Sequence, residues 1–75
     1  MKINDTKSFG EIIKKRRKKL GYTQKYVSDV SGISAGFISD LENGKATIEI
    51  GKAIYLANLL GIDVVLNERG WIIDD

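Results

Sequence analysis

The stretch TQKYVSDVSGIS, the first half of residues 23–44, predicts a short helix that ends in a tight turn. Thr23 is a favourable N-cap because its hydroxyl can accept a hydrogen bond from an amide of the first helical turn. Residues 24–30 then carry the helix. Gly32 can end it, because glycine adopts the left-handed conformation of a helix C-terminus at little steric cost.

The second half, AGFISDLENG, predicts another short helix that follows at once. Ser34 offers the N-cap, residues 35–42 form the helix, and Asn43-Gly44 is a signal for its end. Two helices of about two turns each, joined by a glycine turn, form the helix-turn-helix pattern. In that pattern the second helix enters the major groove of DNA.

These residues resemble a known family. TQKYVSDVSGIS followed by FISDLENGK is similar to the helix-turn-helix shared by phage repressors, Cro and the Xre-type bacterial regulators. Its features fall at fixed offsets, with Gln24 after the cap, Gly32 in the turn, Ile38 inside the second helix and LENG at 41–44. The resemblance covers roughly residues 8–62 and implies an all-α, four-helix domain. A helical hairpin from another small all-α domain is the alternative.

Composition limits the range of functions. A single domain of 75 residues buries only about 60% of the surface of its unfolded chain. The absence of cysteine and histidine excludes disulfides, thiolate chemistry and the usual zinc sites, so we expect no enzyme, metal or cofactor. The first ten residues lack the apolar core of a signal peptide, and no run approaches the roughly 20 apolar residues of a membrane span. These features predict a soluble, cytoplasmic protein.

Charge is unevenly distributed along the chain. Residues 1–25 hold nine Lys or Arg against two acids, a balance of +7, whereas residues 26–75 hold three against eight, a balance of −5. A basic segment of this kind suits a polyanionic partner. Taken alone it would indicate only a solvated lysine-rich helix face. Beside a helix-turn-helix pattern, it favours double-stranded DNA as the partner.

The other helices follow from local signals. Residues 8–11, SFGE, form a capping box that predicts the start of the first helix, and Gly21 ends it. Residues 47–50 alternate as an extended segment does, and a fourth helix is expected over residues 52–60. The family resemblance implies that Gly51 occupies the cap position before this helix. The residues expected to face the core are Phe9, Ile12, Ile13, Leu20, Val27, Ile33, Ile38, Leu41, Ala53, Leu56, Ala57, Leu60 and Ile62.

An ion pair is implied by the resemblance. In the repressor family, an arginine that matches Arg17 pairs with the glutamate that matches Glu42. The pair would tie the first helix to the end of the recognition helix. Arg16 lies nearer the centre of the apolar arc of its helix, so the alternative pairing of Arg16 with Glu42 stays open.

The candidate DNA-binding residues also come from the resemblance. Gln24 is expected to donate to a phosphate beside a helix N-terminus, which itself attracts anions. The positions expected to read bases carry small or acidic side chains, without a bidentate Arg, Lys, Asn or Gln, so much specificity would come from shape or water. The full candidate set is Thr23, Gln24, Ser34, Ala35, Gly36, Phe37, Ser39, Asp40 and Lys45.

The C-terminal part departs from most domains of this kind. The single domain, residues 1–75, is predicted to comprise the helical core 8–62, a short β-strand at 63–69 and a tail at 70–75. A lone strand has unpaired edges, so it must pair, either with the same strand of a homodimer partner or with residues 47–50. A helix-turn-helix followed by a short strand is similar to HipB-type antitoxins.

The predicted function is a sequence-specific DNA-binding repressor that binds a palindrome as a dimer. The resemblance implies a more specific role, an antitoxin that represses its own operon and neutralises a HipA-type kinase toxin. Trp71, Ile72 and Ile73 in the tail would either cover the dimer core or dock on that partner. The alternatives are a phage-type repressor without a toxin and a protein-interaction module that does not read DNA.

Overall fold

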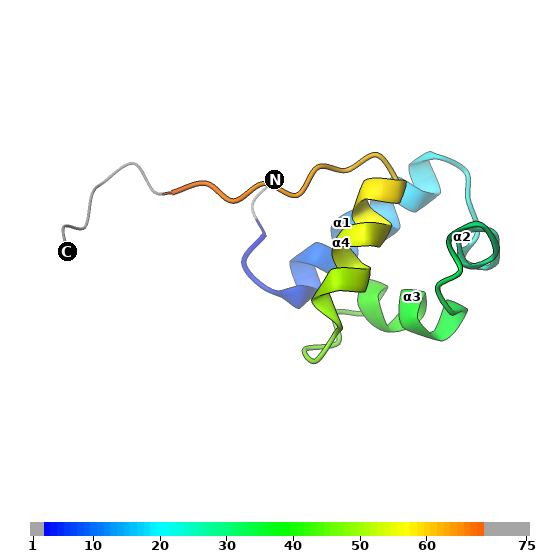
Figure 1. Ribbon diagram of the computed structural model, residues 1–75, viewed down its shortest axis with the longest axis horizontal. Helices are drawn as coiled ribbons and strands as arrows, with labels where there is room; N and C mark the ends of the chain where they lie inside the picture. The colour runs from blue at the N-terminus through cyan, green and yellow to red at the C-terminus, as the bar shows by residue number, and fades with distance from the viewer. Residues whose placement is uncertain (1–2, 69–75) are drawn as a thin grey trace.

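The computed structural model describes residues 3–68, which form four α-helices. Figure 1 shows α4 (Ile50–Leu59) passing in front of α1 (Thr6–Lys19), with α3 (Ala35–Glu42) along the lower edge and α2 (Gln24–Ser31) at the right-hand end of the body. Helix α3 packs against both α1 and α2. The expected four-helix, all-α domain is therefore confirmed.

The ends of α2 and the start of α3 are formed as their sequence predicts. The Thr23 hydroxyl accepts a hydrogen bond from the Tyr26 amide at 3.0 Å. Gly32 ends α2 in the left-handed conformation, with φ of 75°. The Ser34 hydroxyl accepts from the Phe37 amide at 3.1 Å. Each cap satisfies a backbone group that lacks a partner within the helix, so the turn geometry is set locally.

The expected start of α1 is wrong by a few residues. The helix begins at Thr6, and Asp5 is its N-cap, accepting a hydrogen bond from the Ser8 amide at 2.8 Å. Ser8 is thus the third helical residue of the capping box, and Glu11 has no part in it. Asp and Ser are about equally good caps. The earlier start is also stabilised by tertiary contact, because the Thr6 hydroxyl donates to the Gly44 carbonyl at 2.9 Å.

The expected start of α4 is also wrong. Glu49 caps the helix, and its carboxylate accepts hydrogen bonds from the Gly51 and Lys52 amides at 3.0 and 2.7 Å. Gly51 therefore lies inside the first turn and is not the cap. A side-chain acceptor satisfies amides that a glycine cap would leave to water. The extended segment expected over residues 47–50 is not regular, because a turn precedes α4 there.

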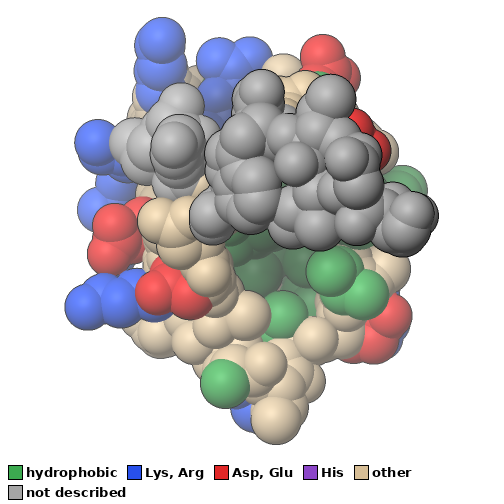
Figure 2. Space-filling model, turned by 90° about the vertical axis from the view of Figure 1, so that its left-hand side faces the viewer, with side chains coloured by type: hydrophobic (Ala, Val, Ile, Leu, Met, Phe, Trp, Pro, Cys, Tyr) green, Lys and Arg blue, Asp and Glu red, His purple; other side chains and the backbone are tan. Residues whose placement is uncertain are grey.

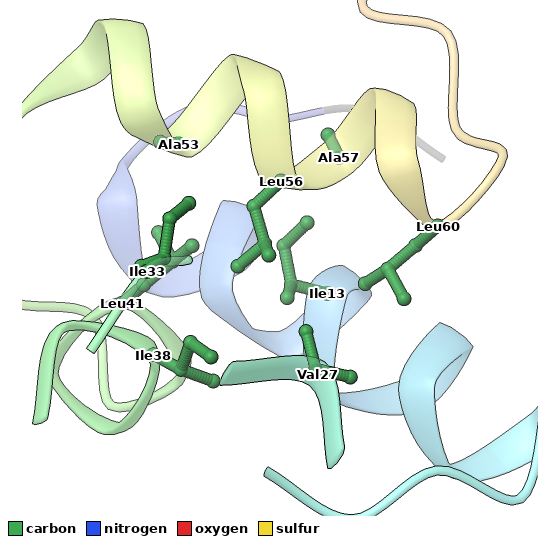
Figure 3. Close-up of a cluster of buried hydrophobic side chains, with 9 residues drawn as sticks. All are labelled: Ile13, Val27, Ile33, Ile38, Leu41, Ala53, Leu56, Ala57 and Leu60. Atoms are coloured by element: carbon green, nitrogen blue, oxygen red, sulfur yellow. The ribbon is translucent and has the colours of Figure 1, made fainter. Parts of the chain in front are cut away.

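The hydrophobic core lies where the four helices meet, and Figure 3 shows Leu56 of α4 and its C-cap Leu60 pointing towards Ile13 of α1. Most of the expected core positions are confirmed. Phe9, Ile12 and Ile62 are only half-buried, and Leu20 is exposed because it is the C-cap of α1, where the chain turns away. The buried hydrophobic residues are Ile13, Val27, Ile33, Ile38, Leu41, Ala53, Leu56, Ala57 and Leu60.

A glycine allows α1 to approach α3 closely. Gly10 is buried, and a Cβ atom at this position would overlap the Leu41 carbonyl oxygen. Gly44, with φ of 79°, packs in the same way against the backbone of Lys7. The N-terminal half of α1 is therefore in backbone contact with the end of α3.

The strand expected over residues 63–69 is not formed in the described chain. Residues 62–68 have no regular secondary structure, and Arg69 lies outside the described residues. The alternative pairing with residues 47–50 is also absent from this part of the structure. A strand needs a partner for its backbone groups, and a single chain offers none here. The tail, 70–75, is likewise outside the described residues.

No helix within residues 3–68 is long and apolar enough to cross a membrane.

Candidate nucleic-acid interface

The outer face of α3 carries the residues expected to read bases. Ser34, Ala35, Gly36 and Asp40 are exposed, and Ser39 is half-buried. Residues three and four apart on a helix share one face, so these positions form a continuous strip along α3. Ala35 and Gly36 have the smallest side chains of this strip. The edge of a DNA groove can therefore approach the backbone of α3 closely at these two residues.

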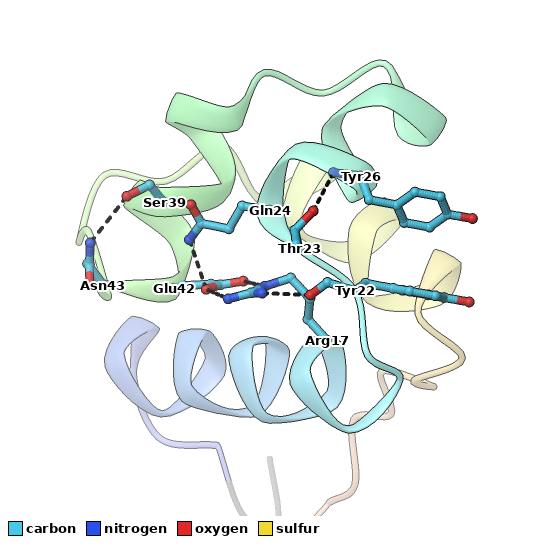
Figure 4. Close-up of polar contacts among 8 residues, drawn as sticks. All are labelled: Arg17, Tyr22, Thr23, Gln24, Tyr26, Ser39, Glu42 and Asn43. Carbon is cyan, nitrogen blue, oxygen red and sulfur yellow. Dashed lines mark hydrogen bonds and ion pairs between the residues drawn. The ribbon is translucent and has the colours of Figure 1, made fainter.

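One polar residue on this strip was missed by the sequence reasoning. Asn43 is exposed, and its Nδ2 atom donates to the Ser39 hydroxyl at 3.4 Å (Figure 4). The sequence pattern predicts for Asn43 only a role in ending the helix. Its position four residues after Ser39 could have placed it on the same face. An amide that can bond adenine in a bidentate manner therefore lies at the end of the strip, contrary to the expectation that none would.

Phe37 lies differently from its neighbours. Its side chain is half-buried and packs against the hydrophobic core, and the Lys52 Nζ atom lies 5.7 Å from the ring centroid. A cation over an aromatic face at this distance is attracted to it. The ring therefore connects α3 to the first turn of α4, and only its exposed part is available to a ligand.

A buried ion pair joins α1 to α3. Arg17 Nε lies 2.6 Å from Glu42 Oε2, and Arg17 Nη2 donates to Glu42 Oε1 at 2.9 Å. Arg17 Nη1 also donates to the Tyr22 carbonyl at 2.8 Å. The predicted pairing of Arg17 with Glu42 is confirmed. The Arg16 alternative is wrong, because Arg16 Nε donates to the Leu60 carbonyl at 2.8 Å.

Gln24 extends this network to the start of α2. Its Nε2 atom donates to Glu42 Oε1 at 3.0 Å, so one carboxylate holds three elements of the fold together (Figure 4). The expected phosphate contact of Gln24 would therefore use the second hydrogen of its amide. The Thr23 hydroxyl accepts from the Tyr26 amide, so it would contact a phosphate as a donor.

The network shifts the ionisation of its members. Burial of Glu42 acts to raise the pKa of its carboxyl, but the hydrogen bonds from Arg17 and Gln24 prevail, and the pKa is lowered. The hydrogen bond to Glu42 raises the pKa of Arg17. Both groups are therefore charged near neutral pH, and the attraction between them holds the end of α3 in place.

Basic residues flank the end of α3. Lys45 is exposed, with its Nζ atom 3.5 Å from Asp40 Oδ2. The backbone of Lys7 lies beside Gly44, the residue that precedes Lys45. Figure 2 shows Lys and Arg side chains along the left-hand edge and the top of the face in view, with acidic side chains among them on the left. Among the described residues, no cluster of three metal-binding side chains occurs.

Two short helices, α2 and α3, are joined by a tight glycine turn, and the outer face of α3 is exposed. This arrangement within four helices defines the class of helix-turn-helix domains. Residues 13–67 match the family model described as "Helix-turn-helix", and the chain belongs to this family. It is also similar to an uncharacterized HTH-type transcriptional regulator, y4mF, of Sinorhizobium fredii (strain NBRC 101917 / NGR234). The two are 32% identical over 63 residues, which cover 84% of this chain and 83% of the relative.

Proposed function

We propose that the protein is a sequence-specific DNA-binding repressor of transcription. The observation that carries this proposal is the exposed strip of α3 from Ser34 to Asn43, held rigidly by the Arg17–Glu42 pair. A recognition helix must be fixed relative to the rest of its domain, because a loosely held helix would lose affinity to conformational entropy. The similarity to a transcriptional regulator supports the same function.

The strip limits how the protein reads DNA. Asn43 and the hydroxyls of Ser34 and Ser39 can bond base edges, Ala35 can contact a thymine methyl group, and Asp40 can accept from a cytosine amine. Thr23, Gln24 and Lys45 would bind phosphates. Few of these contacts are bidentate. Discrimination per base pair is therefore modest, and the shape of the DNA and bound water contribute much of the rest.

We further propose that the protein acts as a homodimer. In the described chain Leu66 is 95% exposed, and Val64 and Val65 beside it are exposed as well. Three consecutive apolar side chains in water are unfavourable, and within residues 3–68 no backbone hydrogen bond joins this segment to another. Pairing with the same segment of a second copy satisfies both and produces two recognition helices related by a two-fold axis. Such a dimer binds a palindromic operator.

The test of DNA binding uses fluorescence anisotropy with two labelled duplexes. One carries the promoter of the protein's own gene, and the other carries the same bases in shuffled order. The proposal predicts tighter binding to the promoter duplex and a steep loss of affinity between about 50 and 200 mM salt, because neutralised phosphates release counterions. Equal affinity for the two duplexes would contradict sequence-specific binding. The protein would then be a protein-interaction module or a basic domain that binds DNA without specificity.

A second candidate is the antitoxin role, with a HipA-type kinase as the neutralised toxin. It is favoured by the chain's ending, ENGKATIEIGKAIYLANLLGIDVVLNERG, which resembles HipB-type antitoxins. The test is co-expression with the product of the neighbouring reading frame. Co-purification of the two proteins, together with loss of the neighbour's toxicity, supports the antitoxin role. A neighbour that neither binds nor harms the cell contradicts it.

A further inference from the structure

An apolar groove lies between α2 and the C-terminal end of α4, and the DNA interface does not use it. We refer to it as the α2–α4 groove. Its volume is about 150 Å³. The Tyr22 and Tyr26 rings form one wall, with their centroids 4.8 Å apart. The residues that line the groove are Tyr22, Tyr26, Val27, Val30, Leu59 and Leu60.

The α2–α4 groove faces away from the DNA-reading strip. In Figure 4 the rings of Tyr22 and Tyr26 point to the side opposite Ser39 and Asn43. Four of the lining residues are large apolar side chains that are exposed to solvent: Tyr22, Tyr26, Val30 and Leu59. A ligand in this groove would leave α3 free to contact DNA.

We propose that the α2–α4 groove binds Trp71 of the second copy of the chain. This inference rests on the proposed dimer. Trp71 is the only tryptophan of the chain, and it lies in the tail just after the apolar segment that would pair the two copies. The described chain reaches the groove directly, because Leu60 lines it and residues 62–68 lead from there towards the tail.

The register of the paired segments brings Trp71 to this place. In an antiparallel pair whose two-fold axis passes through Leu66, Leu66 faces Leu66 of the other chain, and Asp63 faces Arg69 of the other chain. This register places two apolar side chains on the axis and gives two opposite-charge pairs, both of which are favourable across strands. Moving the axis to lie between Val65 and Leu66 would instead set Asp63 against Glu68, which is unfavourable.

In the same register residue 70 lies opposite Ile62 of the other chain, so Trp71 follows just beyond the pair, beside the left-handed turn at Gly61 that ends α4. Facing residues of antiparallel segments lie about 4.5–5.5 Å apart, so an indole at this position can reach the groove without a long connection. The paired segments and the groove therefore form one continuous interface between the two copies.

The size and chemistry of the α2–α4 groove suit an indole ring. An apolar cavity of about 150 Å³ accommodates a benzene-sized ring. Aromatic pairs with tilted or offset rings add attraction beyond their buried area, and two tyrosines stand at the wall. Docking would remove from water both the exposed wall of one copy and the apolar tail of the other.

The fluorescence of Trp71 reports its environment directly, because no other tryptophan contributes. With the full chain, we expect emission at shorter wavelength in the dimer and a shift to longer wavelength as dilution dissociates it, followed in parallel by sedimentation. A sedimenting dimer with water-exposed Trp71 overturns the groove assignment and leaves the proposed dimer intact. A chain that remains monomeric at high concentration contradicts the dimer itself.

A pair of lysine variants tests the groove. Val30 is 55% exposed and lines the groove, whereas Ile50 is 68% exposed and lies outside it. Val30→Lys should shift Trp71 emission to longer wavelength and increase its quenching by acrylamide, while Ile50→Lys should change neither. Circular dichroism checks that both variants fold. Equal effects of the two variants overturn the assignment.

Mixing two variants determines which copy supplies the tryptophan. The Val30→Lys chain carries Trp71 beside a damaged groove, and the Trp71→Phe chain carries an intact groove without tryptophan. In mixed dimers, Trp71 of the first chain meets the intact groove of the second, so emission should return to shorter wavelength when the second chain is in excess. No recovery on mixing overturns docking between copies, and burial of Trp71 only after the neighbouring gene product is added assigns the tail to that protein instead.

Discussion

Arg17 and Glu42 form a two-pronged ion pair across the contact between α1 and α3, with the side chain of Glu42 only 2% exposed. The Glu42 carboxylate also accepts a hydrogen bond from the Gln24 amide, so both Arg17 and Gln24 stabilise its negative charge. The pair links the basic first helix to the recognition helix. It therefore contributes to function through the stability and orientation of α3.

Removing one partner of this pair should be costly. Glu42→Ala leaves a buried arginine without its acceptor, and we expect a loss of about 3–5 kcal/mol in the free energy of unfolding. Replacing Arg17 and Glu42 together with Met and Leu should recover much of that loss, because no charge is left unpaired. Thermal melts of the single and double variants measure this. Equal melting temperatures for Glu42→Ala and the parent would contradict the role of the pair.

The lowered pKa of Glu42 predicts a loss of stability in acid. An unfolded glutamate has a pKa of about 4.3, and the folded value lies below it. The stabilisation is therefore complete above about pH 4.3 and is lost as the pH falls through the folded pKa. Asp5, whose pKa is lowered by the hydrogen bond from the Ser8 amide, acts in the same direction.

Urea unfolding measured from neutral to acidic pH tests this dependence. The variant Glu42→Gln should have a shallower slope of stability against pH in the acid range. Asp5→Asn keeps the N-cap while removing that titration, so it isolates the contribution of Glu42. An unchanged slope in Glu42→Gln would mean that its carboxylate has the same pKa in the folded and unfolded chains.

The backbone contact between α1 and α3 predicts a marked effect of a single methyl group. Gly10→Ala would place its Cβ against the Leu41 carbonyl oxygen, and we expect a loss of about 1–3 kcal/mol. Gly36→Ala is the matched control, because the nearest atom to its Cβ, Ser34 Oγ, lies 4.0 Å away. There the higher helix propensity of alanine should add up to about 1 kcal/mol. Thermal melts in which both variants behave alike would contradict the close packing.

Local signals were enough to predict the centre of the fold. The caps at Thr23 and Ser34 and the turn at Gly32 depend on neighbouring residues only, and the structure confirms them. The start of α1 was predicted wrongly because Asp5 and Ser8 are both good caps, and the choice depends on a contact between Thr6 and the distant Gly44.

Other features could not be read from local signals. Arg16 and Arg17 are adjacent and basic, so only the family resemblance favoured the correct partner of Glu42. The bond from Gln24 to Glu42 joins residues far apart in the sequence. A strand at 63–69 depends on a partner for its backbone groups, so sequence pattern alone could not establish it.

The proposed register of the dimer predicts the effect of exchanging charges. Asp63→Arg should weaken the dimer, because two arginines would then face each other on each side of the axis. The double variant Asp63→Arg with Arg69→Asp restores opposite charges and should restore dimerisation. Sedimentation equilibrium measures both. A double variant as weak as the single variant would contradict this register, and a chain that stops after Ile62 but still dimerises would place the interface elsewhere.

The most direct test of the central claim, that α3 reads bases, compares two alanine variants on promoter and shuffled duplexes. Gln24→Ala should weaken binding to both duplexes by a similar factor, because a phosphate contact carries no sequence information. Ser39→Ala should lower the ratio of the two affinities, by up to about tenfold for the loss of a single hydrogen bond to a base. If the ratio stays the same in Ser39→Ala, and also in Asn43→Ala at the other end of the same hydrogen bond, the outer face of α3 does not read the sequence.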